Sequence, residues 1–241
     1  MRTSNPVWKT GAFQDARGSG ERMTMGGTIG KTAVLFLFLL GTSIYTWSQY
    51  IQGNDIGMMM LIGIVGSLIF ALITIFVPKA APVTAPIYAA LEGFMIGGIS
   101  SFAEARFPGI VIQAAMLTLA VMGALLFLYT SRTIRVTKKF RVMVLSATLG
   151  ILLVYVINFV LRIFFQTEVP YLHSSGPIGI GISLFIVAIA ALNLVLDFDF
   201  IERGVRRGAP KHTEWVGAFG LMVTLVWLYI EILRLLQKIR R

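Results

Sequence analysis

Seven long apolar runs constrain the fold of this chain more than any other feature of its sequence. An α-helix needs about 20 residues to cross a hydrocarbon core of roughly 30 Å, and each run is at least that long. Only helices and closed barrels satisfy their backbone groups in lipid, and these runs lack the period-two alternation of barrel strands. The runs cover residues 32–51, 56–77, 84–104, 110–130, 142–165, 177–199 and 215–236.

The composition agrees with a membrane protein. Hydrophobic residues make up 56% of the chain and charged residues 13%, which leaves too little polar surface to enclose the chain in water. We therefore predict an all-α, polytopic membrane protein with one seven-helix transmembrane domain, residues 32–241. Residues 1–31 form a polar, basic tail that lacks the apolar core and cleavage site of a signal peptide. Its first residues, MRTSNPV, are a candidate for a short docked element.

Basic residues cluster between the apolar runs and predict the orientation. The net charge of +10 would suggest nucleic acid for a soluble domain, but near span ends Lys and Arg set topology and contact anionic lipid head groups. We expect the lipid bilayer, and no nucleic acid, as a partner. The tail, the loop after span four and the loop after span six should share the cytoplasmic side. Seven spans then place the C-terminus outside, although Lys238, Arg240 and Arg241 argue against that side.

The sequence carries no signature of catalysis. It contains no cysteine, which excludes disulfides, thiolate metal sites and a cysteine nucleophile. The two histidines, His173 and His212, fall in loops on opposite sides of the predicted membrane, so they cannot share a metal site. No HExxH, GxSxG or glycine-rich phosphate loop is present. We expect neither an enzyme, nor a cofactor, nor a stably bound metal.

Three ionisable residues form a predicted outer polar layer. A charge at the bilayer centre costs about 2.5–3.5 kcal/mol, so such residues usually face the bundle interior and a partner. Glu231 and Arg234 are three residues apart on span seven and can pair locally. Arg162 of span five either reaches Glu231 or extends to the membrane interface. We interpret this layer as a structural ion pair that fixes helix register.

Two aspartates end span six, towards the cytoplasmic side. Residues two apart on a helix point roughly 200° from each other, so Asp197 and Asp199 cannot face the same partner. Asp199 has Arg203 four residues later, an arrangement suited to a solvated pair at a helix end. Asp197 has Asn193 one turn earlier, which extends a polar stripe into the bundle. We therefore predict Asp197 as the inward carboxylate and Asp199 as structural.

Small residues predict close helix packing. Gly93 and Gly97 form a small-xxx-small pair in span three, which lets another helix approach its backbone. The stretch GPIGIGIS opens span six and is interpreted in the same way, with a loosened helix start as the alternative.

Several stretches resemble one family in their order and spacing. They are ALEGFMIGG in span three, FPGIVIQAAMLT opening span four, LVLDFD ending span six and WLYIEILRLL in span seven. From about residue 30 onward the chain resembles the transmembrane Bax inhibitor motif family, in particular its bacterial Bax inhibitor-like members, and MRTSNPV resembles the start of one bacterial subgroup. The resemblance implies a bundle with the last helix central, a bacterial inner membrane, a pH-sensitive calcium leak and a role in stress responses.

The resemblance also implies a site. In family members with the leak activity, one aspartate in span six and one in span seven close the cytoplasmic side of the pore. Asp197 matches the first, but the second position falls near Thr224, counting back from Arg234. Glu92 of span three lies at a similar predicted depth, and our hypothesis is that Glu92 and Asp197 share a proton as a coupled pair. Thr224 and Asn193 would be its neutral neighbours, and calcium would be coordinated transiently.

Two alternatives stay open. Glu92 could instead accept hydrogen bonds from backbone groups or threonine side chains of a neighbouring helix. The protein could also be a non-conducting regulator that binds another membrane protein, such as a protease or a stress factor, through its helix surfaces and basic loops.

Overall fold

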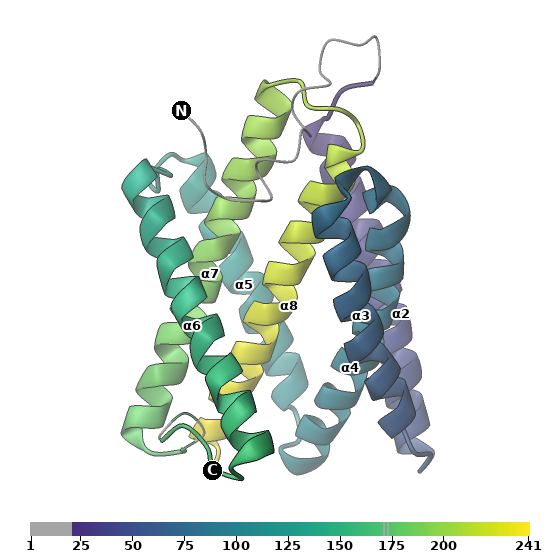
Figure 1. Ribbon diagram of the computed structural model, residues 1–241, viewed down its shortest axis with the longest axis vertical. Helices are drawn as coiled ribbons and strands as arrows, with labels where there is room; N and C mark the ends of the chain where they lie inside the picture. The colour runs from purple at the N-terminus through teal and green to yellow at the C-terminus, as the bar shows by residue number, and fades with distance from the viewer. Residues whose placement is uncertain (1–20, 171, 173) are drawn as a thin grey trace. The chain divides into compact units, whose positions relative to one another are not determined.

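The computed structural model describes residues 21–170, 172 and 174–241 and confirms the all-α prediction (Figure 1). MRTSNPV and His173 therefore lie outside the described residues. Within the described part, seven helices are long and apolar enough to cross a membrane. Their bounds are α2 Met25–Ile51, α3 Gly57–Phe76, α4 Ala81–Arg106, α5 Ile110–Thr130, α6 Lys138–Phe164, α7 Pro177–Arg206 and α8 Thr213–Ile239, with a 3₁₀ turn, η1 Pro78–Ala80, before α4.

Helix ends differ from the predicted span ends where polar residues extend the helix. Helix α2 begins seven residues before the predicted start at 32, because the Thr24 side chain caps it by accepting a hydrogen bond from Gly27 N. Helix α7 continues to Arg206, two turns beyond the predicted end at 199. There Arg203 pairs with Asp199, and cations near a helix C-terminus are favourable.

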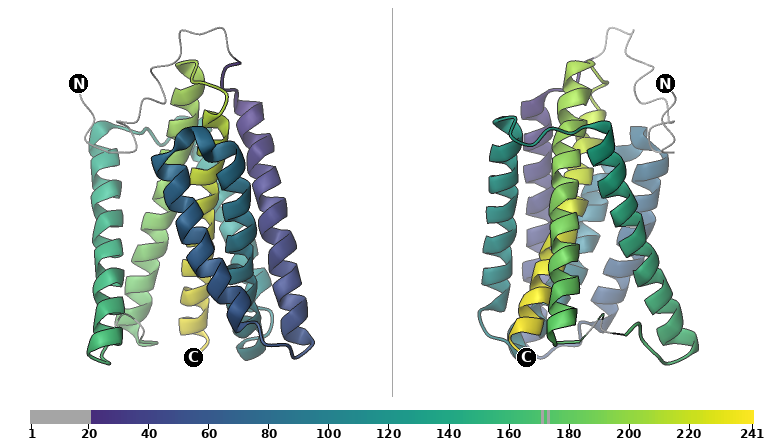
Figure 2. Two further views of the ribbon diagram at one scale, coloured as in Figure 1. Left: turned by 45° about the vertical axis from the view of Figure 1, so that its right-hand side comes forward. Right: turned by 90° about the vertical axis from the view of Figure 1, so that its left-hand side faces the viewer.

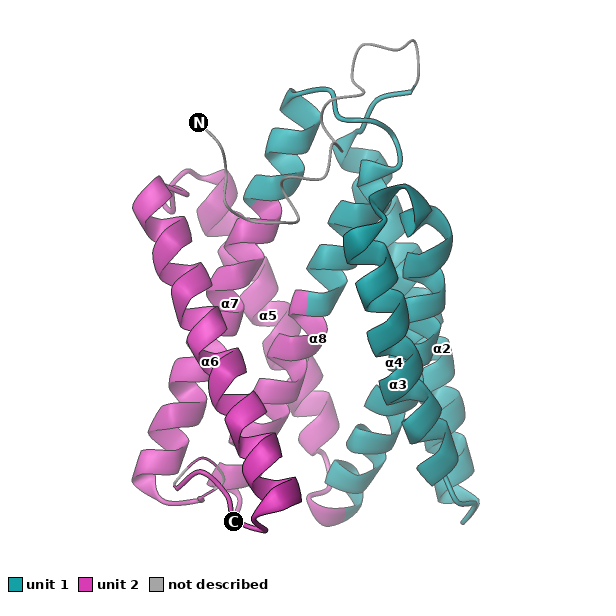
Figure 3. Cartoon of the chain, viewed as in Figure 1, with its two compact units in different colours: residues 1–105, 199–223 teal, residues 106–198, 224–241 magenta. Residues whose placement is uncertain are grey.

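The chain divides into two compact units, which Figure 3 colours separately. Unit 1 contains residues up to 105 and Asp199–Val223, and unit 2 contains Arg106–Phe198 and Thr224–Arg241. Helices α2, α3 and α4 belong to unit 1, and α5 and α6 belong to unit 2. Helices α7 and α8 contribute to both units, and each changes colour along its length in Figure 3. Figure 2 shows the course of the helices in two further views. The central position implied for the last helix stays a prediction.

In unit 1, α4 packs closely against α2 and α3, as its small residues predict. A Cβ at Gly93 would collide with Leu39 and Thr42 of α2, and one at Gly98 with Met60 of α3. The Ser43 hydroxyl of α2 donates to the Gly93 carbonyl at 3.0 Å. The small-xxx-small interpretation is therefore confirmed for the contact of α4 with α2.

Helices α2, α3, α5 and α6 each bury only one narrow stripe. In α6 the buried residues are Val144, Ile151 and Asn158, seven residues apart and so on one face. In unit 2, Ile151 packs with Ile186 and Ile189 of α7. The remaining faces carry exposed large hydrophobic side chains, which suits contact with lipid tails.

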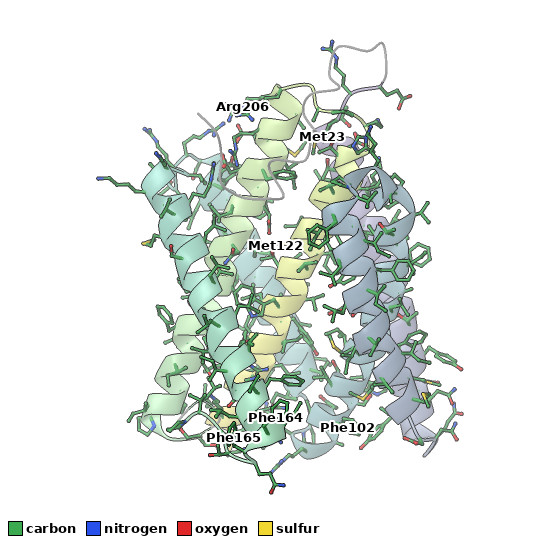
Figure 4. The ribbon with its side chains drawn as sticks, in the orientation of Figure 1. Met23, Phe102, Met122, Phe164, Phe165 and Arg206 are labelled. Atoms are coloured by element: carbon green, nitrogen blue, oxygen red, sulfur yellow. The ribbon has the colours of Figure 1, made fainter. Side chains whose placement is uncertain are left out.

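The N-terminal segment and the α7–α8 loop meet at one end of unit 1. An isolated antiparallel bridge joins Arg22 to Pro210, and Met23 N donates to Ala209 O at 2.7 Å. The Met23 side chain, labelled in Figure 4, packs against Ile201 and Ala209. These two basic segments therefore share one side, as their charge predicts.

The C-terminal end of α8 lies beside two other loops of unit 2. Arg240 donates to Pro108 O at 3.0 Å and to Gln113 Oε1 at 2.7 Å, and Lys238 donates to Leu172 O. The C-terminus therefore shares one end with the loops after α4 and α6, as an odd number of spans requires.

Candidate functional site

Asp197 lies on α7 in unit 2 and is half-buried. The hydroxyl of Thr224 on α8 donates a hydrogen bond to it, so the structure brings together the two positions that the family resemblance singles out. The second carboxylate oxygen, Oδ2, is buried and has no hydrogen-bond partner within the described part of the chain. The site therefore holds one satisfied and one unsatisfied acidic oxygen.

Asn193 lies one turn before Asp197 but is bonded elsewhere. Its Nδ2 donates to Thr148 Oγ1 of α6 at 2.8 Å and to the Ile189 carbonyl at 2.8 Å. Asn193 therefore fastens α7 to α6 and does not donate to the carboxylate of Asp197.

Asp199 forms the predicted pair with Arg203, at 2.8 Å. The expectation that this pair is solvated is wrong, because the two side chains are only 11% and 22% exposed. Helix α7 continues to Arg206, so Asp199 lies two turns before the helix end and Arg203 lies in the last turn. The backbone carbonyl of Asp199 also accepts from Arg203 Nε at 3.1 Å.

Glu92 of α4 is buried in unit 1, with 6% of its surface exposed. Two hydroxyl groups donate to its carboxylate, one from Ser67 of α3 and one from Tyr88, a turn earlier on α4. These contacts resemble the alternative left open for Glu92, because one of the hydroxyl donors comes from a neighbouring helix. That donor is a serine and not the threonine that the alternative named. Asp197 belongs to the other unit, so the pairing of Glu92 with Asp197 stays a prediction.

The outer layer in unit 2 forms a denser network than the sequence suggests. Glu231 is 1% exposed, and its Oε1 accepts from Arg234 Nη1 at 3.1 Å, from Tyr155 OH at 2.8 Å and from Trp227 Nε1 at 3.3 Å. Arg234 also donates to Tyr155 OH at 2.7 Å. Arg162 does not join the network. Its side chain is 69% exposed and lies 3.6 Å from Glu168, so it extends to the helix end.

The sequence does not indicate that two further charged residues are buried. Glu214 at the start of α8 is fully buried in unit 1 and pairs with Lys31 of α2. Lys238 in the last turn of α8 is 5% exposed. An acid in the first turn of a helix and a base in its last turn are common, because each interacts favourably with the helix dipole. Only the burial of these two side chains is unusual, and burial cannot be recognised before the fold is known.

The chemistry of these residues is that of oxygen ligands and proton acceptors. Within the described residues, no group of three or more His, Cys, Asp or Glu could hold a metal ion. A carboxylate beside a hydroxyl, as at Asp197 and Thr224, can take up a proton or coordinate a passing hard cation.

Comparison with known proteins adds the family. A family model described as Bax inhibitor 1 like matches residues 5–241, nearly the whole chain. A search of curated proteins found no match, and a search of solved structures found none. The match confirms the resemblance seen in the four sequence stretches, and the seven apolar helices agree with a multi-pass membrane protein. The chain belongs to the Bax inhibitor 1 like family.

Proposed function

We propose that this membrane protein is a pH-sensitive calcium leak in which the carboxylates of Asp197 and Glu92 take up and release protons. The observation that carries the proposal is the environment of Asp197, whose Oδ2 is buried without a hydrogen-bond partner in the described part of the chain. A buried carboxylate in this state is stabilised by gaining a proton or by binding a cation. These are the two events that a proton-controlled cation path requires.

A comparison of the buried acids in the helices supports these two residues. Asp199 pairs with Arg203, Glu214 with Lys31, and Glu231 with Arg234. Asp197 and Glu92 differ, because hydroxyl groups are their hydrogen-bond donors and no Lys or Arg of the described chain pairs with them. A neighbouring cation favours the ionised form of a carboxylate, so an ion-paired carboxylate resists protonation. A carboxylate whose donors are hydroxyl groups lacks such a neighbouring cation. The family resemblance independently implies a pH-sensitive calcium leak.

Calcium flux into liposomes tests the proposal. Purified protein is reconstituted with a calcium indicator inside the vesicles, and flux is measured across a pH series. We expect Asp197→Asn and Glu92→Gln each to flatten the pH dependence, because the amide cannot be ionised. Asp199→Asn, two residues away on the same helix, is the matched control and should keep it. Unchanged flux and pH dependence in both Asp197→Asn and Glu92→Gln would refute the proposal.

The second candidate is a non-conducting regulator of another membrane protein. The observation in its favour is a basic segment formed by the loop between α5 and α6 and the first turn of α6. Arg135 of the loop and Lys138 and Lys139 of the helix are exposed, and no acid occurs between residues 106 and 167. Such a segment suits an acidic partner surface. The same liposomes discriminate, since a leak requires no partner, and the absence of flux at every pH would favour the regulator.

A further inference from the structure

Lys238 lies in a cage of neutral oxygen atoms within unit 2. Its Nζ donates to the carbonyl of Leu172 at 2.6 Å, to the carbonyl of Gly179 at 3.0 Å and to the hydroxyl of Ser183 at 2.7 Å. An ammonium group has three N–H donors, and all three are used. Burial of an ammonium is unfavourable unless its donors are paired, so this cage is what allows the lysine to be 5% exposed.

No carboxylate takes part in the cage. Within the described residues Lys238 forms no ion pair. The nearest acid along its own helix is Glu231, which lies two turns before Lys238 and pairs with Arg234. The atoms that accept hydrogen bonds from the ammonium group are therefore all neutral carbonyl and hydroxyl oxygens. Neutral oxygens of this kind coordinate monovalent cations in potassium-selective filters, whereas calcium sites in proteins add carboxylates to them.

The cage is built from three segments of unit 2. Leu172 belongs to the loop between α6 and α7, Gly179 and Ser183 lie one turn apart on the same face of α7, and Lys238 comes from the last turn of α8. A Cβ at Gly179 would collide with Ser174 of the loop, so glycine allows the loop to fold over the helix start. The ligands are carbonyl and hydroxyl oxygens, and the N–H groups of the helix start are not involved.

We propose that these oxygens form a site for a monovalent cation of about the size of K⁺, and that the ammonium group of Lys238 occupies it as a tethered cation. An ammonium ion carries the same charge as K⁺ and is close to it in size, so a cage that satisfies one suits the other. In the native protein the lysine excludes free cations. Gly179 is eighteen residues from Asp197, roughly 27 Å along α7, so this site is separate from the proposed proton sensors.

Removal of the lysine side chain tests the site without any flux measurement. We compare thermal unfolding of the wild type and Lys238→Ala in detergent, in chloride salts of K⁺, NH₄⁺, Na⁺, Ca²⁺ and N-methylglucamine at equal ionic strength. In N-methylglucamine the variant should unfold on the order of 5 °C below the wild type, because buried carbonyls lose their partner. K⁺ and NH₄⁺ should restore its Tm in a saturable manner, and Ca²⁺ should not.

Three further variants make the result decisive. Ser183→Ala added to Lys238→Ala removes one ligand and should abolish the rescue. Arg240→Ala removes an exposed cation two residues beyond Lys238 and should show no K⁺ dependence. Lys238→Ser supplies a hydroxyl in the same gap, so it is less disruptive and should also bind K⁺. The proposal is overturned if neither Lys238 variant responds to K⁺ or NH₄⁺, including by remaining unfolded in both, or if the wild type responds equally.

Discussion

Replacement of Glu214 tests what holds the start of α2 against the α7–α8 loop. The carboxylate of Glu214 is fully buried and accepts hydrogen bonds from Thr24 N at 2.8 Å and Thr24 Oγ1 at 2.9 Å. It also pairs with Lys31 and lies 3.4 Å from Lys211. One carboxylate thus joins the N-cap of α2 to the first turn of α8, and its removal should loosen this end of unit 1.

The magnitude follows from burial. Removal of one partner from a buried ion pair costs about 3–5 kcal/mol. The side chains of Lys31 and Lys211 are 18% and 42% exposed, so both can turn towards water once the carboxylate is lost. We therefore expect the lower end, about 3 kcal/mol of unfolding free energy for Glu214→Ala. In a chain of this length that loss lowers Tm by roughly 6–12 °C.

The assay is thermal unfolding in detergent, monitored by far-ultraviolet circular dichroism. Gly27 provides an independent perturbation, because a Cβ at this position would collide with the carboxylate of Glu214. Gly27→Ala should therefore lower Tm in the same direction. Gly30→Ala is the matched control, since no atom lies within 4 Å of its Cβ position. It should leave Tm unchanged or raise stability by about 0.5–1 kcal/mol through helix propensity.

Two results would refute this reasoning. One is a wild-type Tm for Glu214→Ala. The other is an equal shift for Gly27→Ala and Gly30→Ala, which would mean that contact with the carboxylate is irrelevant. A double-mutant cycle with Lys31→Met isolates the pair, and a coupling energy near zero would show that Lys31 and Glu214 do not stabilise each other.

Three further expectations follow from single contacts. Tyr155→Phe removes a donor to buried Glu231 and should cost about 1–3 kcal/mol in chemical unfolding, whereas Arg162→Gln breaks only an exposed pair and should cost about 0–1 kcal/mol. Gly97→Ala places a Cβ 2.9 Å from Ser43 Cα and should cost about 1–3 kcal/mol, whereas Gly123→Ala, with no neighbouring atom within 4 Å, should be tolerated. Because the chain has no cysteine, single cysteines at positions 54 and 133 should report the membrane sides, with only the first labelled by an impermeant maleimide from outside intact cells.

The helices themselves could be predicted because a membrane span depends on local properties. A run of apolar residues of sufficient length satisfies its backbone within itself, whatever surrounds it. The predicted span 110–130 matches Ile110–Thr130 residue for residue. The acid at Asp197 and the close approach at Gly93 were also identifiable, since a charge or a glycine in an apolar run is conspicuous in the sequence alone.

The partners of the buried polar groups were decided by the tertiary structure. Glu214 meets Lys31 across 183 positions of the chain, and Lys238 meets oxygens from the loop before α7 and from α7 itself. No periodicity encodes these contacts, because they depend on how each helix is rotated about its axis. Helices with several nearly equivalent apolar faces can be rotated at little cost, and the few polar pairs that must be satisfied in a water-free interior select the rotation that is adopted.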